Sequence, residues 1–136
     1  MAKQVRPGLE PVPKDAPDRP RGLAELCARA AYETRGEDIR ILRVEELCSY
    51  ADYFVVATGR NRRQLRAMAE ETEDAMERSH LRKRGVEGLS GGEWILLDYG
   101  DVIVHLFDPS ARAFYQLEEI WADAPTVSWR PPPSGD

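Results

Sequence analysis

The sequence has few of the residues that build metal centres or disulfide frameworks. Its 136 residues include two cysteines and two histidines, and Cys27 and Cys48 show no CxxC spacing. We therefore expect no metal site and no cofactor, and we interpret both thiols as small apolar groups, buried or half-buried, in a reducing cytoplasm. The sequence also lacks a hydrophobic run long enough to cross a bilayer, and its N-terminus lacks a signal-peptide core. These absences predict a cytoplasmic protein with no membrane partner.

An excess of positive charge is missing as well. The 24 acidic residues outnumber the 19 basic ones, which gives a net charge of -5. A protein that grips nucleic acid along its phosphate backbone needs a broad basic face. We therefore expect no direct reading of nucleic acid, and expect a nucleoprotein partner to be met through its protein. The basic residues gather locally at Arg82-Lys83-Arg84 and at Arg60, Arg62, Arg63 and Arg66. Such clusters suit a marginal contact with phosphate.

Proline is rare in the middle of the chain and frequent at both ends. Because proline lacks a backbone donor and disfavours helix, residues 1–21 and 125–136 are predicted to be disordered, Pro-rich tails. The remaining residues, 22–124, have the size of one compact domain.

Hydrophobic periodicity predicts the elements of that domain. The expected order is a helix over 22–33, a strand over 38–44, a strand over 52–59, a helix from Asn61 to Ser79, a hairpin over 93–107, and a helix that begins at Asp108. The second strand is a continuous apolar run, which is typical of a central strand buried on both faces. Residues 80–92 are interpreted as a mobile connection with one short extended piece at most. This order predicts an α/β fold with a mixed sheet of about four to five strands flanked by helices.

The hairpin EWILLDYGDVIVHLF, residues 93–107, sorts its side chains by chemistry. If Tyr99 and Gly100 form a two-residue loop, Asp98 pairs with Asp101 and Trp94 with His105. One face is then aliphatic, with Ile95, Leu97, Val102, Val104 and Leu106, while the other carries Trp94, Leu96, Asp98, Asp101, Ile103, His105 and Phe107. A longer loop would shift this register and change the pairs.

The mixed face of the hairpin is the first candidate for a working surface. Two carboxylates opposite each other in a ladder repel, so a sequence built for stability alone would avoid that pair. Asp98 and Asp101 could serve acid and base chemistry with His105, or could hold Mg²⁺ in an enzyme. The alternative is that both aspartates are turn residues and that Trp94 belongs to the core. The sequence leaves these interpretations open.

The strand, Gly59 and the following helix N-terminus also resemble a phosphate cradle, although no GxGxxG or GKS motif is present. A solvated face of arginines explains this segment more simply.

Two long segments resemble the ribosomal silencing factor family, also called Iojap or RsfS. They are DYFVVATGRNRRQLRAMAEE, residues 52–71, and EWILLDYGDVIVHLFDPSARAFYQLEEIWADA, residues 93–124. The resemblance implies a repressor without enzymatic activity, which binds the large ribosomal subunit through its fourteenth protein. It would block association with the small subunit and repress translation when nutrients are scarce. It also implies a homodimer when free.

The family's fold is similar to that of nucleotidyltransferases, and this similarity leaves an alternative, an enzyme that uses Asp98 and Asp101 with Mg²⁺. However, Gly59 is followed by Arg60 where active members have a glycine-serine motif. On the family interpretation, the residues expected to contact the ribosomal protein are Trp94, Asp98, Tyr99, Gly100, Asp101, His105 and Phe107. Aromatic groups would supply most of the affinity there, and carboxylates would orient the basic partner.

Overall fold

A six-stranded mixed sheet, in the order β3-β4-β5-β2-β1-β6, forms the middle of the molecule. The structure is a computed structural model that describes residues 5–131. Its elements are α1 (Arg19–Glu33), β1 (Glu37–Arg43), β2 (Tyr53–Thr58), α2 (Arg62–Arg78), β3 (Gly85–Glu87), β4 (Trp94–Asp98), β5 (Val102–Phe107), α3 (Pro109–Tyr115), α4 (Leu117–Ile120) and β6 (Thr126–Val127). The predicted α/β class is confirmed, and the sheet has six strands where four to five were expected.

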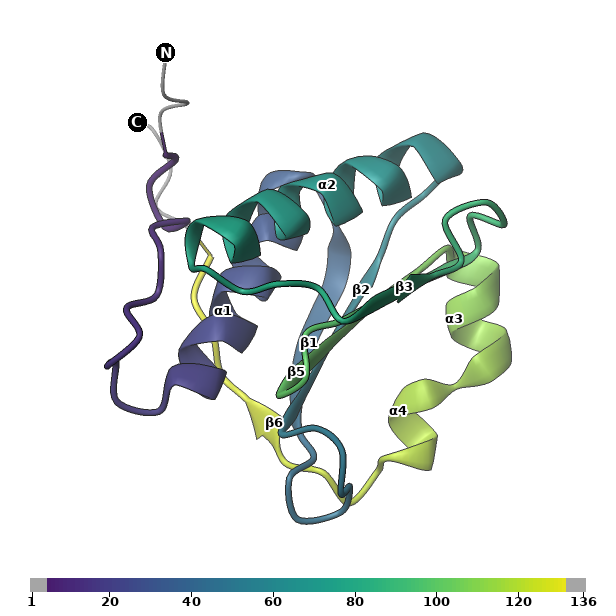
Figure 1. The fold of residues 1–136 in the computed structure, drawn as a ribbon. Coiled ribbons are helices and arrows are strands. Elements are labelled where there is room, and N and C mark those ends of the chain that lie inside the picture. The colour runs from purple at the N-terminus through teal and green to yellow at the C-terminus, as the bar shows by residue number, and fades with distance from the viewer. Residues whose placement is uncertain (1–4, 132–136) are drawn as a thin grey trace.

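The sheet lies between two unequal helical layers. Figure 1 shows α1 and α2 packed together on one side and the short helices α3 and α4 on the other. β2 runs parallel to β5 and antiparallel to β1, and almost all of it is buried, which confirms the predicted central strand. The larger core fills the α1/α2 side, and a smaller cluster around Phe54 and Phe107 fills the other. The α3/α4 face therefore has less cover.

Side-chain caps fix where two helices begin, as the sequence predicted. Asn61 Oδ1 accepts from Gln64 N at 2.8 Å, and Gln64 Oε1 accepts in return from Arg60 N at 2.7 Å. Asp108 Oδ1 accepts from Ala111 N at 2.7 Å, one turn into the helix that Pro109 starts. Because these bonds satisfy donors that the first helical turn leaves unpaired, they hold both N-termini at defined positions.

The hairpin has the predicted faces but a different register. Tyr99 N donates to Val102 O at 2.9 Å, so the two turn residues are Gly100 and Asp101. Gly100 has φ 86°, a conformation that glycine adopts without strain and tyrosine would not. The predicted Tyr99-Gly100 loop is therefore wrong. Trp94 pairs with Phe107, Leu96 with His105, and Asp98 with Ile103.

The last predicted helix is divided in two. Gln116 adopts left-handed backbone angles, with φ 48° and ψ 48°, between α3 and α4. The direction of the chain changes at that residue, so the apolar residues of the predicted helix, Phe114, Leu117, Ile120 and Trp121, do not share one buried face. Phe114 is 79% exposed and Ile120 is 71% exposed, whereas Leu117 is buried.

Both predicted tails pack on the domain over their described residues, and this corrects the sequence-based expectation. At the N-terminal end, Leu9 is fully buried in the main core, and α1 begins at Arg19 rather than at residue 22. At the C-terminal end, β6 pairs with β1, and Trp129 Nε1 donates to Ile39 O at 3.3 Å. Few but well-placed apolar residues thus outweigh the prolines around them. Residues 1–4 and 132–136 lie outside the described residues.

Ser79→Ala is expected to lower the free energy of unfolding by about 1 kcal/mol, because a partly buried hydrogen bond is lost. Ser79 Oγ accepts from Val12 N at 2.9 Å and thereby ties the N-terminal segment to the end of α2. Chemical denaturation measures the loss, and hydrogen exchange at the Val12 amide should become faster in the variant. Unchanged exchange at Val12 would contradict the packing of this segment.

Candidate functional site

Trp94 is at the centre of the less covered sheet face. Its ring centroid lies 4.9 Å from that of Phe107 and 4.7 Å from that of Tyr115. β4 places Trp94, Leu96 and Asp98 on this face, all of them half-buried, while Ile95 and Leu97 enter the main core. The alternation predicted for the hairpin is therefore confirmed, and Trp94 remains partly accessible to solvent.

His105 is a buried, neutral neighbour of Trp94. His105 is only 4% exposed, and its Nδ1 accepts a hydrogen bond from Trp94 Nε1 at 3.2 Å. Burial lowers the pKa of His105 from 6.5 to about 4. Since Nδ1 accepts, the proton of the neutral ring is on Nε2, a buried atom that has no hydrogen-bond partner among the described residues. His105 therefore orients Trp94 and does not reach the surface itself.

The two aspartates of the hairpin do not form a pair. Asp98 faces Ile103 and accepts from Gly100 N at 2.8 Å, while Asp101 is exposed in the turn. The turn interpretation of Asp98 is thus confirmed, and the predicted Asp98–Asp101 ladder pair is wrong. Because His105 lies opposite Leu96 in the next strand, these three groups do not form an acid-base cluster. Within residues 5–131, no group of three His, Cys, Asp or Glu residues could hold a metal ion.

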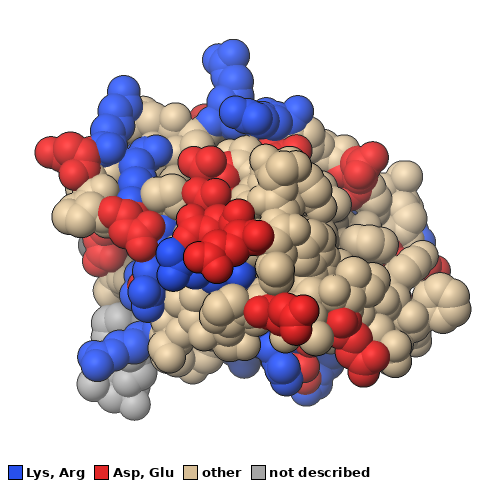
Figure 2. Space-filling view, turned by 90° about the horizontal axis from the view of Figure 1, so that it is seen from below, with Lys and Arg blue, Asp and Glu red and all other residues tan. Residues whose placement is uncertain are grey.

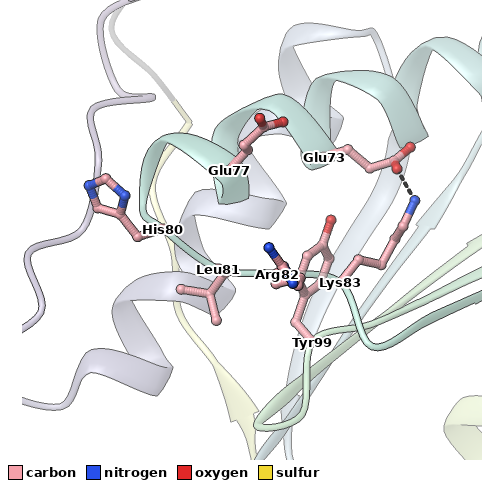
Figure 3. A pocket seen from close by; sticks show the side chains of 7 residues that line it. All are labelled: Glu73, Glu77, His80, Leu81, Arg82, Lys83 and Tyr99. Carbon is pink, nitrogen blue, oxygen red and sulfur yellow. Dashed lines mark hydrogen bonds and ion pairs between the residues drawn. The ribbon is translucent and has the colours of Figure 1, made fainter.

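Tyr99 points to the opposite side of the sheet. It is 6% exposed, and burial is the main cause that raises the pKa of its phenol, followed by nearby acidic groups. Figure 3 shows its ring beneath α2, where it lines a hollow of about 470 Å³ with Glu73, Glu77, His80, Leu81, Arg82 and Lys83. Glu73 and Lys83 form an ion pair at this hollow. Tyr99 and Trp94 therefore cannot belong to one contact surface.

Of the remaining predicted contact residues, Phe107 is fully buried and Gly100 is buried behind the side chain of Arg84. Phe107 supports the ring of Trp94 from below and is not available to a partner. The structure thus leaves Trp94, Asp98 and Asp101 as the members of the predicted set that solvent reaches.

A groove beside Trp94 brings in residues that sequence reasoning missed. It has a volume of about 330 Å³ and is lined by Glu87, Gly88, Gly91, Glu93, Trp94, Leu96 and Tyr115. Glu87 reaches it because the β3–β4 ladder places that residue opposite Leu96, and Tyr115 because α3 ends there. The hairpin sequence alone contains neither contact. The Asp108-Pro109 signal predicted where α3 begins, but not that Tyr115 at its end lies beside Trp94.

Exposed apolar side chains extend the surface beyond the groove. Phe114 and Ile120 project from α3 and α4, and Tyr50, 62% exposed, lies beside Phe54 at a centroid distance of 6.5 Å. Figure 2 shows the molecule from below, with a broad uncharged area on the side of α3 and α4 and acidic side chains around it. Apolar groups that gather in this way mark an interaction site more often than a solvated surface.

Arg112 holds α3 in position at the edge of this surface. Its guanidinium donates to both carboxylate oxygens of Glu118, at 3.2 and 3.0 Å, and to Thr58 Oγ1 at 2.9 Å. It also donates to the carbonyl oxygen of Asp38 at 2.6 Å. These bonds join α3 and α4 to the ends of β1 and β2, so the exposed aromatic residues are presented from a fixed backbone.

No helix in the described part of the chain is long and apolar enough to cross a membrane.

Comparison with known proteins gives consistent matches. The family model described as "Ribosomal silencing factor during starvation" matches residues 16–135. The ribosomal silencing factor RsfS of Bacillus subtilis is 35% identical over 105 residues, which cover 77% of this chain and 89% of the relative. The chloroplastic protein Iojap of Zea mays is 36% identical over 105 residues, covering 77% of this chain and 46% of its own length.

Solved structures agree with these matches. A crystal structure of a Chromobacterium violaceum protein superposes with a TM-score of 0.73 at 30% sequence identity, and the match covers 85% of this chain and 92% of that one. A Bacillus halodurans protein gives a TM-score of 0.71 at 30% identity, covering 79% of this chain and 98% of its own.

Proposed function

Since the chain belongs to the ribosomal silencing factor family, we propose that it binds the large ribosomal subunit and prevents the small subunit from joining it. The contact would be made with the fourteenth protein of the large subunit, and translation would be repressed when nutrients are scarce. The site of action would be the cytoplasm, where the subunits meet.

The observation that supports this proposal is the aromatic surface around Trp94. Trp94 and Tyr115 lie side by side, half-buried and exposed respectively, and exposed apolar residues of α3 and α4 continue the surface. Aromatic side chains in such positions supply most of the affinity of a protein interface. The acidic residues around them would attract a basic ribosomal protein and speed the encounter.

The proposed mechanism is steric and makes or breaks no bond. A domain bound at the joining surface occupies the space that the small subunit needs. The enzyme alternative has little geometric support, because Asp98 is bonded within its own turn and His105 is buried and neutral at pH 7.

A subunit-joining assay tests the proposal. Purified small and large subunits are mixed with increasing amounts of the protein, and sedimentation measures the joined ribosomes. We expect joining to fall as the protein saturates the large subunit. Normal joining in saturating excess would contradict the proposed function.

Trp94→Ala is expected to weaken binding to large subunits by on the order of 2 kcal/mol, about 30-fold, because an aromatic anchor is removed. Trp129→Ala is the matched control, since Trp129 is also half-buried and also donates through Nε1, but packs against Tyr32 of α1. Co-sedimentation measures both affinities, and circular dichroism verifies that each variant is folded. Equal binding by the folded Trp94→Ala variant and the wild type would remove Trp94 from the contact.

We further propose that the free protein forms a homodimer and touches ribosomal RNA at its margin. The exposed Phe114 and Ile120 would be covered by a second copy. Arg35, Arg60 and Arg63 line one hollow at the start of α2 and would make the RNA contact. Analytical ultracentrifugation at several concentrations measures the self-association directly.

A further inference from the structure

We propose that the groove beside Trp94 receives a lysine or arginine side chain of the protein partner. The inference rests on the proposed function and adds the chemistry of the residue that is recognised. The carboxylates that meet the partner would then be those of Glu87 and Glu93, in place of the predicted Asp98 and Asp101.

The lining of the groove suits a long side chain with a charged end. Its apolar part consists of Trp94, Leu96 and Tyr115. The ring centroids of Trp94 and Tyr115 are 4.7 Å apart, with an interplanar angle of 48°. The methylene stem of lysine or arginine packs well on such a surface while its head remains near water. Aromatic faces also attract the cationic head, most strongly the face of tryptophan.

Two carboxylates border this apolar lining, and neither is neutralised. Glu87 and Glu93 are both exposed and both line the groove. No ion pair or hydrogen bond joins either carboxylate to another residue within the described range 5–131. The groove therefore presents two negative charges beside an aromatic pair.

Two arginines of α2 donate to the backbone of the loop 88–92. Arg62 donates to Gly91 O at 3.3 Å, and Arg66 donates to Leu89 O at 3.5 Å. Both side chains come from α2 and hold the loop from behind. Neither arginine is among the residues that line the groove, and within residues 5–131 neither forms an ion pair with Glu87 or Glu93.

Backbone contacts hold both acidic residues in place. Glu87 is in the β3–β4 ladder opposite Leu96, and Glu93 O accepts from Asp108 N at 2.9 Å. Between them, Gly88 has φ 87° and lies so close to Trp94 that an added Cβ would be 1.8 Å from its carbonyl oxygen. A partner thus meets carboxylates whose backbone is already ordered, which lowers the entropic cost of binding.

Other occupants fit the groove less well. An acidic side chain or a phosphate would be repelled by both carboxylates. A purely apolar side chain would desolvate these carboxylates without giving them a partner, which costs free energy. A cation satisfies the carboxylates and the aromatic faces together.

The test compares the double variant Glu87→Gln/Glu93→Gln with the wild type in binding to purified large subunits. Both changes keep size and hydrogen-bonding capacity and remove two negative charges. We expect affinity to fall about tenfold at low salt, and the decrease of binding with added salt to be less steep than in the wild type. The control is Glu70→Gln/Glu77→Gln, two exposed residues of α2 with the same change of charge. Its affinity should stay within about twofold of the wild type.

Three results would overturn the inference. If the Glu87/Glu93 double variant binds like the wild type while Trp94→Ala binds weakly, the groove takes no cation, although the proposed function stands. If both double variants lose affinity equally, net charge and not the groove is responsible. If the wild type fails to bind large subunits, the proposed function fails, and the inference fails with it.

Discussion

Gly88→Ala is expected to lower the free energy of unfolding by about 3 kcal/mol. The backbone of Gly88 has φ 87°, a left-handed conformation that costs a residue with a Cβ about 1–2 kcal/mol. The new Cβ would also lie 1.8 Å from Trp94 O and 3.3 Å from Ile95 Cα. These atoms belong to the backbone of β4, so the strand itself must move, and forced overpacking of this kind costs about 1–3 kcal/mol more.

Gly85→Ala is the matched control for this prediction. Gly85 is three residues away, in β3, and an added Cβ would meet nothing within 4 Å. The same substitution should therefore raise the free energy of unfolding by about 0.5 kcal/mol, because alanine loses less backbone freedom on folding. Urea denaturation of both variants measures the two values. Similar stabilities for Gly88→Ala and Gly85→Ala would contradict the close approach of the loop to Trp94.

His105 is expected to make the protein less stable by about 3 kcal/mol as the pH falls from 7 to 4. In the unfolded chain a histidine binds a proton below about pH 6.5. In the folded protein burial lowers the pKa of His105 to about 4, so the ring stays largely neutral until the pH approaches 4. The unfolded state therefore binds more protons than the folded state, and acid shifts the equilibrium toward unfolding. The contribution is fully present above pH 6.5 and lost by pH 4.

The comparison of pH dependences isolates His105 from the carboxylates, which also titrate in this range. The free energy of unfolding is measured at pH 7 and pH 4 for the wild type, His105→Asn and His80→Gln. The first variant keeps an acceptor for Trp94 Nε1 and removes the titrating ring, so its loss of stability should be smaller by about 3 kcal/mol. His80 is exposed, and its variant should follow the wild type. Parallel curves for all three proteins would show that His105 is accessible to protons when folded.

Sequence patterns predicted the sides of the sheet better than the pairs within it. Strand side chains alternate strictly, so Trp94, Leu96 and Asp98 share a face in any register that keeps this parity. The pairing depended on which two residues turn, and the strain of tyrosine at positive φ decides this in favour of Gly100 and Asp101. The sequence therefore predicted which face of the sheet carries the candidate site. The predicted Asp98–Asp101 pair was wrong because the loop lies one residue further along the chain than predicted.

The other differences come from contacts between distant segments. Local composition marked residues 1–21 as a tail, but Leu9 is buried in the core cluster that also contains residues of α1 and α2. The groove is likewise built from β3, β4 and α3 together. Glu87, Trp94 and Tyr115 are too far apart in the sequence for a local pattern to predict their contact. Tyr99 was predicted to lie in the loop, but it precedes the turn, so its side chain follows the alternation of β4 and enters the main core.

The short pairing of Thr126 and Val127 with β1 has an effect on solubility. Without it, the longest strand of the sheet would offer a row of unpaired backbone groups on which another chain could add. The opposite margin of the sheet, β3, is three residues long and is followed directly by the bend at Gly88. Both margins are therefore poor templates for strand addition, so crowded copies of the protein are protected from polymerising into fibrils.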